Sequence, residues 1–400
     1  MTRLFKTICS AAVMLAVSSN IFAQETRTTT SNGIKNDSCN PCKPKCEPAC
    51  KPCPPCCFFE QGLDLPDDCR PPCDVRFFPA YNAAAQPRVD CSWDFNVDAT
   101  FIYWYVNQDD MNIAEITPSF SGTNGEIVDQ STGYAPGFKI GLGWDTLFDN
   151  WALNAEYTWL HTSKSGSVAN GTPGNGLYTL TNWFPNLGVV NNKEGITIGY
   201  ANYTNVDSTW KMHLDQLDLI VSRPFYEGTH LTVSPSAGIR GLWIRQSLKI
   251  NVGGGNLTDL GVTGESVTTS QSWAVGPKVG VNTHWLLGMG FRFDYLMGSS
   301  LLYSHYDLKN IKLFPKYSFA PKSENTKNVV RPTLDMGFGF GYGMYALRNT
   351  MYFDLAVRYD FSQFWSQNMM RNFVSQLEGG AEDIGDLFMH GLTITLRTDF

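Results

Sequence analysis

The chain has 400 residues and a net charge of −7, and it is rich in aromatic residues (13%) and in glycine (36 residues). The negative charge is spread along the chain, which argues against nucleic acid as a partner. After residue 23 no apolar stretch is long enough for a membrane helix, and this composition is typical of a membrane β-barrel, in which each strand has one apolar face.

Residues 1–23 predict a secretory signal peptide. Arg3 and Lys6 give it a positive start, residues 8–17 form an apolar centre, and Ala23 ends a plausible cleavage site. The apolar centre is too short to span a membrane as a helix. We therefore expect the chain to be exported.

Residues 24–91 predict an irregular arm that is rich in cysteine and proline. Six prolines between positions 41 and 55 exclude a helix or a central strand and favour an extended, stiff segment. Apart from Cys9 in the signal peptide, every cysteine of the chain lies in this arm. They are Cys39, Cys42, Cys46, Cys50, Cys53, Cys56, Cys57, Cys69, Cys73 and Cys91.

An even number of clustered cysteines in an exported chain more often forms disulfides than metal sites. Two pairs, Cys39/Cys42 and Cys53/Cys56, have the spacing of zinc ligands, but the arm contains no His. We therefore predict disulfides at these ten positions, and neither a metal nor another cofactor. Their pairing stays open, because the arm either links to envelope proteins or a second copy of the chain, or closes on itself as a small knot.

From residue 92 the sequence alternates between apolar and polar residues, which is the pattern of strands with one buried face. The first run, Trp93 to Tyr103, covers about 33 Å of strand, or ~25 Å along the membrane normal at ~40° tilt. Similar runs recur as far as residues 392–400. A soluble β-sandwich would also alternate, but it would not need aromatic residues at the ends of its strands.

The connections between these runs alternate in length. Tight connections are expected at 146–149, 223–229, 285–288 and 346–350, and long ones at 107–132, 163–207, 246–269, 304–328 and 362–388. Short periplasmic turns and long outer loops are typical of outer-membrane barrels. We therefore predict an all-β fold in which residues 92–400 form a transmembrane antiparallel up-and-down β-barrel, with the arm in the periplasm.

The expected number of strands is about ten. Segments 177–184 and 195–203 would raise it to twelve if they formed a further hairpin of the barrel. The alternation also changes phase within 209–222, which predicts a β-bulge near Asp215 and Gln216.

The chain ends in an alternating strand whose final residue is Phe400. This ending resembles the C-terminal recognition signal of bacterial outer-membrane proteins. We therefore expect Phe400 to act as an assembly signal, the barrel assembly machinery to be a partner, and outer-membrane lipid to surround the barrel.

Alternation also predicts which charged side chains turn into the barrel. The predicted pore-lining residues are Lys139, Glu156, Lys211, His213, Asp215, Arg240, Lys278, Arg292, Asp294, Asp335, Asp354, Arg358 and Arg397. Their mixed signs favour a narrow pore for small hydrophilic solutes with weak ion selectivity. Alternatively, these charges neutralise one another and close the barrel.

Glycines at 337, 339, 341 and 343 share one predicted inward face with Asp335. No helix follows them, so a dinucleotide site is not expected. Such a bare face implies either an open lumen or a segment that lies against it. Residues 362–388 are the candidate segment, and packing of this segment on neighbouring loops outside the lumen is the alternative.

His213 beside Asp215 resembles the Asp–His pair of an outer-membrane protease. Adjacent polar residues arise by default on a lumen wall, so we predict no catalytic residue and no enzyme.

Several motifs resemble the Legionella major outer membrane protein family, whose members are also found in chlamydia-related bacteria. The motifs are Gly238–Ile244, Gly276–Gly280, Ser299–Tyr303, Tyr359–Phe361 and Trp365–Asn368. The resemblance covers the predicted barrel and implies pore formation. The cysteine arm departs from it and resembles the cysteine-rich envelope proteins of chlamydia-like bacteria, in which disulfides stiffen the outer membrane.

The resulting expectation is a porin that is also a disulfide-cross-linked component of the envelope. A closed barrel with a structural or adhesive role is the first alternative, and an outer-membrane hydrolase is a weaker one.

Overall fold

The computed structural model describes twelve stretches of the chain. They are residues 94–117, 125–146, 150–169, 178–180, 188–192, 195–199, 204–228, 230–253, 263–313, 322–346, 350–373 and 384–400. The predicted signal peptide and the arm with its ten cysteines lie outside these residues. In these stretches no helix is both long and apolar enough to cross a membrane.

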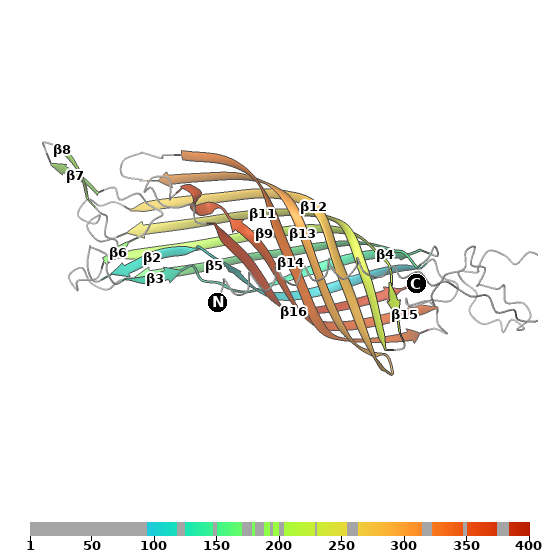
Figure 1. The fold of residues 1–400 in the computed structure, drawn as a ribbon. Helices are drawn as coiled ribbons and strands as arrows, with labels where there is room; N and C mark the ends of the chain where they lie inside the picture. Colours follow the sequence, from blue (N-terminus) through green and yellow to red (C-terminus); the bar gives the residue numbers. More distant parts are fainter. Residues whose placement is uncertain are drawn as a thin grey trace, which may run out of the picture. The chain divides into compact units, whose positions relative to one another are not determined.

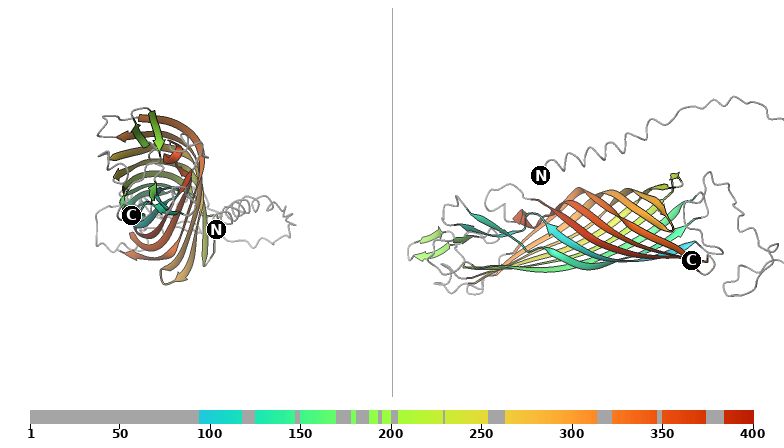
Figure 2. Two further views of the ribbon diagram at one scale, coloured as in Figure 1. Left: turned by 90° about the vertical axis from the view of Figure 1, so that its left-hand side faces the viewer. Right: turned by 90° about the horizontal axis from the view of Figure 1, so that it is seen from below.

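Ten antiparallel strands close into a barrel, in which each strand pairs with its neighbours along the chain and β1 pairs with β16 (Figures 1 and 2). The ten strands are β1 (Phe95–Gln108), β4 (Gly133–Asp145), β5 (Ala152–Ala169), β9 (Asn205–Ser222), β11 (Leu231–Gly253), β12 (Gly264–Gly288), β13 (Phe291–Leu313), β14 (Lys322–Ala346), β15 (Met351–Asn368) and β16 (Gly385–Asp399). The predicted fold class is therefore confirmed.

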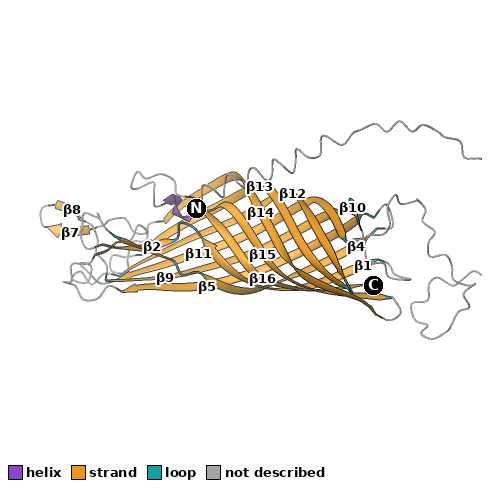
Figure 3. Cartoon of the chain, turned by 60° about the horizontal axis from the view of Figure 1, so that its bottom comes forward, coloured by secondary structure: helices purple, strands orange, loops and turns teal. Residues whose placement is uncertain are grey.

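The remaining elements are not members of this closed ring of strands (Figure 3). They are β2 (Asn112–Thr117), β3 (Glu126–Asp129), β6 (Tyr178–Leu180), β7 (Gly188–Asn192), β8 (Gly195–Gly199), β10 (Tyr226–Glu227) and the 3-10 turn η5 (Met370–Phe373). Strand β6 pairs with β2, and β8 pairs with β7. The segments that would have raised the count to twelve therefore form separate small sheets, and the barrel has ten strands.

Several connections are shorter than the sequence suggested. Strands β12 and β13 are joined by Met289 and Gly290, whose positive φ angles of 54° and 85° suit a tight hairpin turn. The predicted turn at 285–288 instead ends β12. The strands also extend into two segments that were predicted as loops, and most of residues 246–269 and 304–328 is strand. The strands continue there because their inner faces still pack in the barrel after their outer faces have become polar.

The outer surface of the barrel carries the predicted apolar band. Leu142, Phe340 and Leu355 each expose roughly half of their surface, as side chains do when they face lipid. Aromatic pairs mark both edges of the band. Phe95 stacks on Trp144 near the tight turns, and Tyr103 stacks on Tyr134 toward the long connections.

The bulge predicted near Asp215 and Gln216 is wrong. Strand β9 pairs without interruption with β5 and with β11 along its whole length. Trp210, Met212 and Leu214 point into the barrel and are at most 1% exposed, whereas Leu217 and Leu219 lie on the outer surface. The phase change therefore records a switch of the apolar side chains from the inner to the outer face of one regular strand.

This switch divides the barrel interior into two parts. The part toward the long connections is filled by buried apolar side chains, which we call the apolar layer. It comprises Ile102, Trp104, Val106, Leu160, Trp210, Met212, Leu214, Leu242, Ile244, Leu248, Leu302, Phe364, Met370, Leu387 and Met389. The part toward the tight turns is polar and charged.

Replacing Leu355 with Arg is expected to destabilise the inserted barrel by about 2–4 kcal/mol, because the charge would lie in lipid. Replacing Asn282, which lines the polar part of the interior, with Arg should leave assembly intact. Refolding into lipid vesicles, followed by denaturant titration, measures both effects. Equal tolerance of the two substitutions would refute the observed strand register.

Candidate functional site

The polar part of the interior encloses a cavity of about 490 Å³, which we call the chamber. Inner side chains from all ten barrel strands line it. Trp104, Leu214 and Met389 of the apolar layer bound it on one side, and it extends to Pro224 and Tyr352 beside the tight turns.

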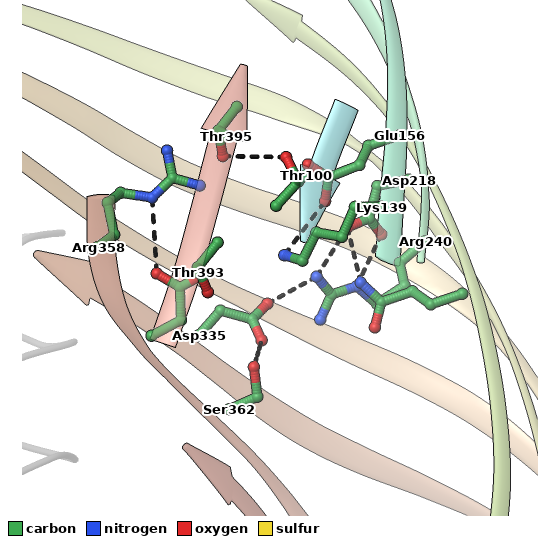
Figure 4. Close-up of polar contacts among 12 residues, drawn as sticks. Thr100, Lys139, Glu156, Asp218, Arg240, Asp335, Arg358, Ser362, Thr393 and Thr395 are labelled. Atoms are coloured by element: carbon green, nitrogen blue, oxygen red, sulfur yellow. Dashed lines mark hydrogen bonds and ion pairs between the residues drawn. The ribbon is translucent and has the colours of Figure 1, made fainter. Parts of the chain in front are cut away.

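Arg240 on β11 is the centre of the most buried ion pairs in the chamber (Figure 4). Its guanidinium donates two hydrogen bonds to Asp218 on β9, at 2.8 and 2.9 Å, and both side chains are 1% exposed. It also lies 2.6 Å from Asp335 on β14, on the far side of β12 and β13. Lys278 donates to Asp218 at 2.8 Å. This network therefore ties together strands that are not neighbours in the barrel wall.

A second network lies nearer the tight turns. Arg292 donates to Asp294 at 2.8 Å and pairs with Asp354 through both terminal nitrogens. The Nδ1 atom of His284 lies 2.7 Å from the Oδ1 atom of Asp294. A planar guanidinium that bridges two carboxylates holds both in fixed positions.

The remaining cations of the chamber are also paired. Lys139 lies 3.5 Å from Glu156 and 5.0 Å from the centre of the Trp104 ring. Arg358 lies 3.6 Å from Asp360, whose other oxygen accepts a hydrogen bond from Thr393. Figure 4 shows Lys139, Glu156 and Arg358 around the same space as Arg240.

Arg397 pairs with Asp399 at 2.6 Å and lies 3.4 Å from Asp145. Every Lys and Arg that lines the chamber therefore has a carboxylate partner among the described residues.

Ten of the thirteen predicted pore-lining residues line the chamber. They are Lys139, Glu156, Arg240, Lys278, Arg292, Asp294, Asp335, Asp354, Arg358 and Arg397. Lys211, His213 and Asp215 do not, because β9 contains no bulge and these odd-numbered positions face outward. The prediction that these three residues line the lumen is therefore wrong. The Asp–His pair does not lie on the lumen wall either, and Asp215 accepts a hydrogen bond from Tyr157.

Four further carboxylates line the chamber and were missed. They are Asp98, Asp145, Asp218 and Asp360. Asp98 and Asp360 alternate with lipid-facing residues, so their inward direction was visible in the sequence. Asp218 alternates with Leu217 and Leu219, so its inward direction was visible in the same way, with or without a bulge.

The row of glycines on β14 is neither bare nor covered by another segment. Side chains from adjacent strands lie across it. A side chain at Gly337 would collide with Asp360, one at Gly341 with Arg292, and one at Gly343 with Tyr352. The glycines therefore provide the room in which large polar side chains of β13 and β15 lie flat against the wall.

The segment 362–388, considered as a plug, takes part in the apolar layer. Residues 362–368 continue β15, and η5 follows with Met370 fully buried within the layer. Residues 374–383 lie outside the described part of the chain. The described portion of the segment therefore turns into the barrel rather than packing outside it.

The motif Trp365–Asn368 makes this inward turn. Ser366 has a positive φ of 56°, and the register with β16 shifts between Phe364 and Asn368, which defines a β-bulge. The Ser366 amide donates to Asp386 at 2.8 Å, and Arg331 donates to the Ser366 carbonyl at 3.2 Å. Asn368 then accepts a hydrogen bond from the amide of Met370.

A closed antiparallel barrel with an aromatic, apolar outer band and a charged interior is characteristic of bacterial outer-membrane proteins. The profile of one family, described as "Legionella pneumophila major outer membrane protein precursor", matches residues 85–400. The chain therefore belongs to the Legionella major outer membrane protein family, as the sequence motifs suggested. It is an outer-membrane β-barrel, and this family is not a family of enzymes.

Comparison with curated protein sequences found no match. Among solved structures, a major outer membrane protein from Thermus thermophilus is 11% identical with a TM-score of 0.28, over 77% of this chain and 98% of that one. Ail, the attachment invasion locus protein of Yersinia pestis, is 8% identical with a TM-score of 0.22, over 76% and 99%. The Ralstonia pickettii toluene transporter TbuX is 9% identical with a TM-score of 0.26, over 77% and 90%. Such low values carry no information on function.

Proposed function

We propose that the protein is a porin for small hydrophilic solutes, and that the apolar layer closes its pore in the arrangement described here. The observation that carries this proposal is the chamber. Charged side chains on all ten strands, most of them in ion pairs, surround a cavity of about 490 Å³ that extends to the tight turns. This cavity gives polar solutes a hydrated entrance from that side.

The apolar layer is the barrier in this proposal. Its side chains are buried, and they come from seven barrel strands and from η5. A narrow apolar constriction stops ions by excluding water, and it conducts when its side chains move apart. Because η5 enters the layer from a bulge rather than from the regular wall, it is the element that can leave with the least loss of strand pairing.

A structural role for a permanently closed barrel is the competing function. The same apolar layer supports it, because an interior that stays packed would let no solute pass. The hydrolase alternative loses the residues on which it depended, since His213 and Asp215 lie on the outer surface and not in the lumen.

Single-channel recording of the refolded full-length protein in planar bilayers distinguishes the pore from the closed barrel. Openings with a reversal potential near zero in a salt gradient support the pore. Absence of channel openings, even after substitutions have opened the apolar layer, would instead identify the barrel as a structural anchor.

We further propose that the arm, residues 24–91, lies in the periplasm and forms disulfides through its ten cysteines, which would make the protein a cross-linked envelope component. The support is the even number of clustered cysteines in an exported chain. Non-reducing gels of whole cells should then show high-molecular-weight species that collapse on reduction. Ten free thiols, or stoichiometric bound zinc, would contradict this proposal.

A further inference from the structure

Lys211 and His213 on β9 lie in one patch on the outer surface with residues of the two adjoining strands. In the strand register, His213 is directly opposite His161 on β5 and Arg245 on β11. Lys211 lies in the next row toward the long connections, opposite Ser247. We call Lys211, His213, His161 and Arg245 the basic patch.

The basic patch begins where the apolar band ends. The row immediately below it contains Trp159 and Trp243, opposite Asp215. Trp159 stacks on Phe138 of the band, and Trp243 is exposed on the outer surface. Beyond Trp243, the outward residues of β11 are polar. Tryptophans at such an edge mark the level of the lipid headgroups, so the basic patch lies at headgroup depth.

The side chains of the patch are available to an external ligand. Arg245 is 62% exposed, and its only carboxylate contact among the described residues is Asp215, at 3.5 Å. Asp215 is also engaged by Tyr157, whose hydroxyl donates to it at 2.7 Å. Lys211 is exposed and forms no ion pair within the described stretches. The imidazoles of His161 and His213 stack at 4.0 Å between ring centres, which fixes their position beside Arg245.

A different situation holds farther along the same row of paired residues, on β13 and β14. Lys309 lies in the row of Lys211 and pairs with Glu324 at 3.5 Å. His305 contacts Asn328 and Asp307. Lys309 therefore has a carboxylate partner, although it shares Glu324 with Lys322, which lies 2.7 Å from the same carboxylate. Lys211, in contrast, has no ion-pair partner in the described stretches, and Arg245 has only Asp215.

We propose that Lys211, His213 and Arg245 bind the headgroup phosphate of an anionic lipid in the leaflet on the side of the long connections. Arg offers a planar pair of donors that matches phosphate geometry, and Lys adds a point charge one row away. The acyl chains of the same lipid would lie along the apolar band below Trp159 and Trp243. This proposal is independent of whether the barrel conducts.

The test uses full-length protein in mixed micelles and counts bound lipid by native mass spectrometry, with phosphatidic acid as the anionic probe and phosphatidylcholine as the reference. The wild-type barrel should retain one phosphatidic acid in preference to phosphatidylcholine. The variant K211Q/R245Q should lose this preference, with affinity reduced roughly thirtyfold, because each cation near a membrane surface contributes about a fivefold factor.

K309Q is the matched control, because it removes an exposed lysine of the same row that already has a carboxylate partner. It should bind phosphatidic acid as the wild type does. Barrel folding of all variants is verified by circular dichroism. No preference in the wild type, or an equal loss in K309Q and K211Q/R245Q, would overturn the site in favour of diffuse attraction or none.

Discussion

Replacing Phe364 and Met370 with alanine is expected to turn a mostly closed barrel into one that conducts steadily. Phe364 lies on the inner face of β15 and Met370 on η5, and both are buried in the apolar layer. Truncating them removes apolar volume where the pore is blocked, so water can enter and connect the chamber with the far side. Single-channel recording in planar bilayers should show longer openings and larger current steps than in the wild type.

The matched control is F338A/M344A, which removes the same side chains from the lipid-facing surface of β14. It should leave the conductance unchanged. Each interior truncation also destabilises the barrel by about 2–5 kcal/mol, so M370A alone is the milder variant if the double variant fails to refold. Folded interior variants that conduct no better than F338A/M344A would contradict a closed pore and favour the structural barrel.

Replacing Arg240 with methionine is expected to destabilise the barrel by about 3 kcal/mol, the lower end of the range for a broken buried ion pair. The reason is that Asp218, 1% exposed, and Asp335 would remain in the chamber without their main cation. Lys278 still reaches Asp218 at 2.8 Å, which limits the loss. Denaturant titration of vesicle-inserted protein measures this free energy of unfolding.

Two comparisons test the cause of that loss. R240M/D335N should recover part of the stability, because one uncompensated carboxylate has become neutral. K309M breaks an exposed pair and should change stability by at most about 1 kcal/mol. If the pore conducts, R240M should also shift its selectivity toward cations. Equal losses in R240M and K309M would show that the Arg240 network does not hold the barrel strands together.

The barrel and most of its charged interior were predictable from the sequence, because side chains alternate between the two faces of a strand. A run such as residues 353–361 fixes the direction of Asp354 and Arg358 once Leu355 and Val357 are assigned to lipid. The long-range pairing of Arg240 with Asp335 was not predictable. It depends on which strands face each other across the lumen, and alternation within a single strand carries no information on that.

The apolar layer was missed because the sequence was interpreted as if only the outer face could be apolar. From Phe101 to Val106 on β1, successive residues are apolar on both faces, and Ile102, Trp104 and Val106 prove to be buried inside. Loss of alternation without loss of hydrophobicity is the signature of a strand buried on both sides. On β9 the same transition, at Leu214 and Leu217, was mistaken for a bulge.

The unequal lengths of the strands make one side of the barrel taller than the other. Strands β11 to β14 have 23–25 residues, whereas β1 and β4 have 14 and 13. About ten additional residues lengthen a strand by about 33 Å, so one side of the barrel stands well above the other on the side of the long connections. The outward faces of this high side carry exposed ion pairs such as Lys249–Glu265 and Lys309–Glu324. If the long connections face outward, as the short turns on the periplasmic side of such barrels predict, this tall and charged side is the part of the barrel that extends farthest from the lipid.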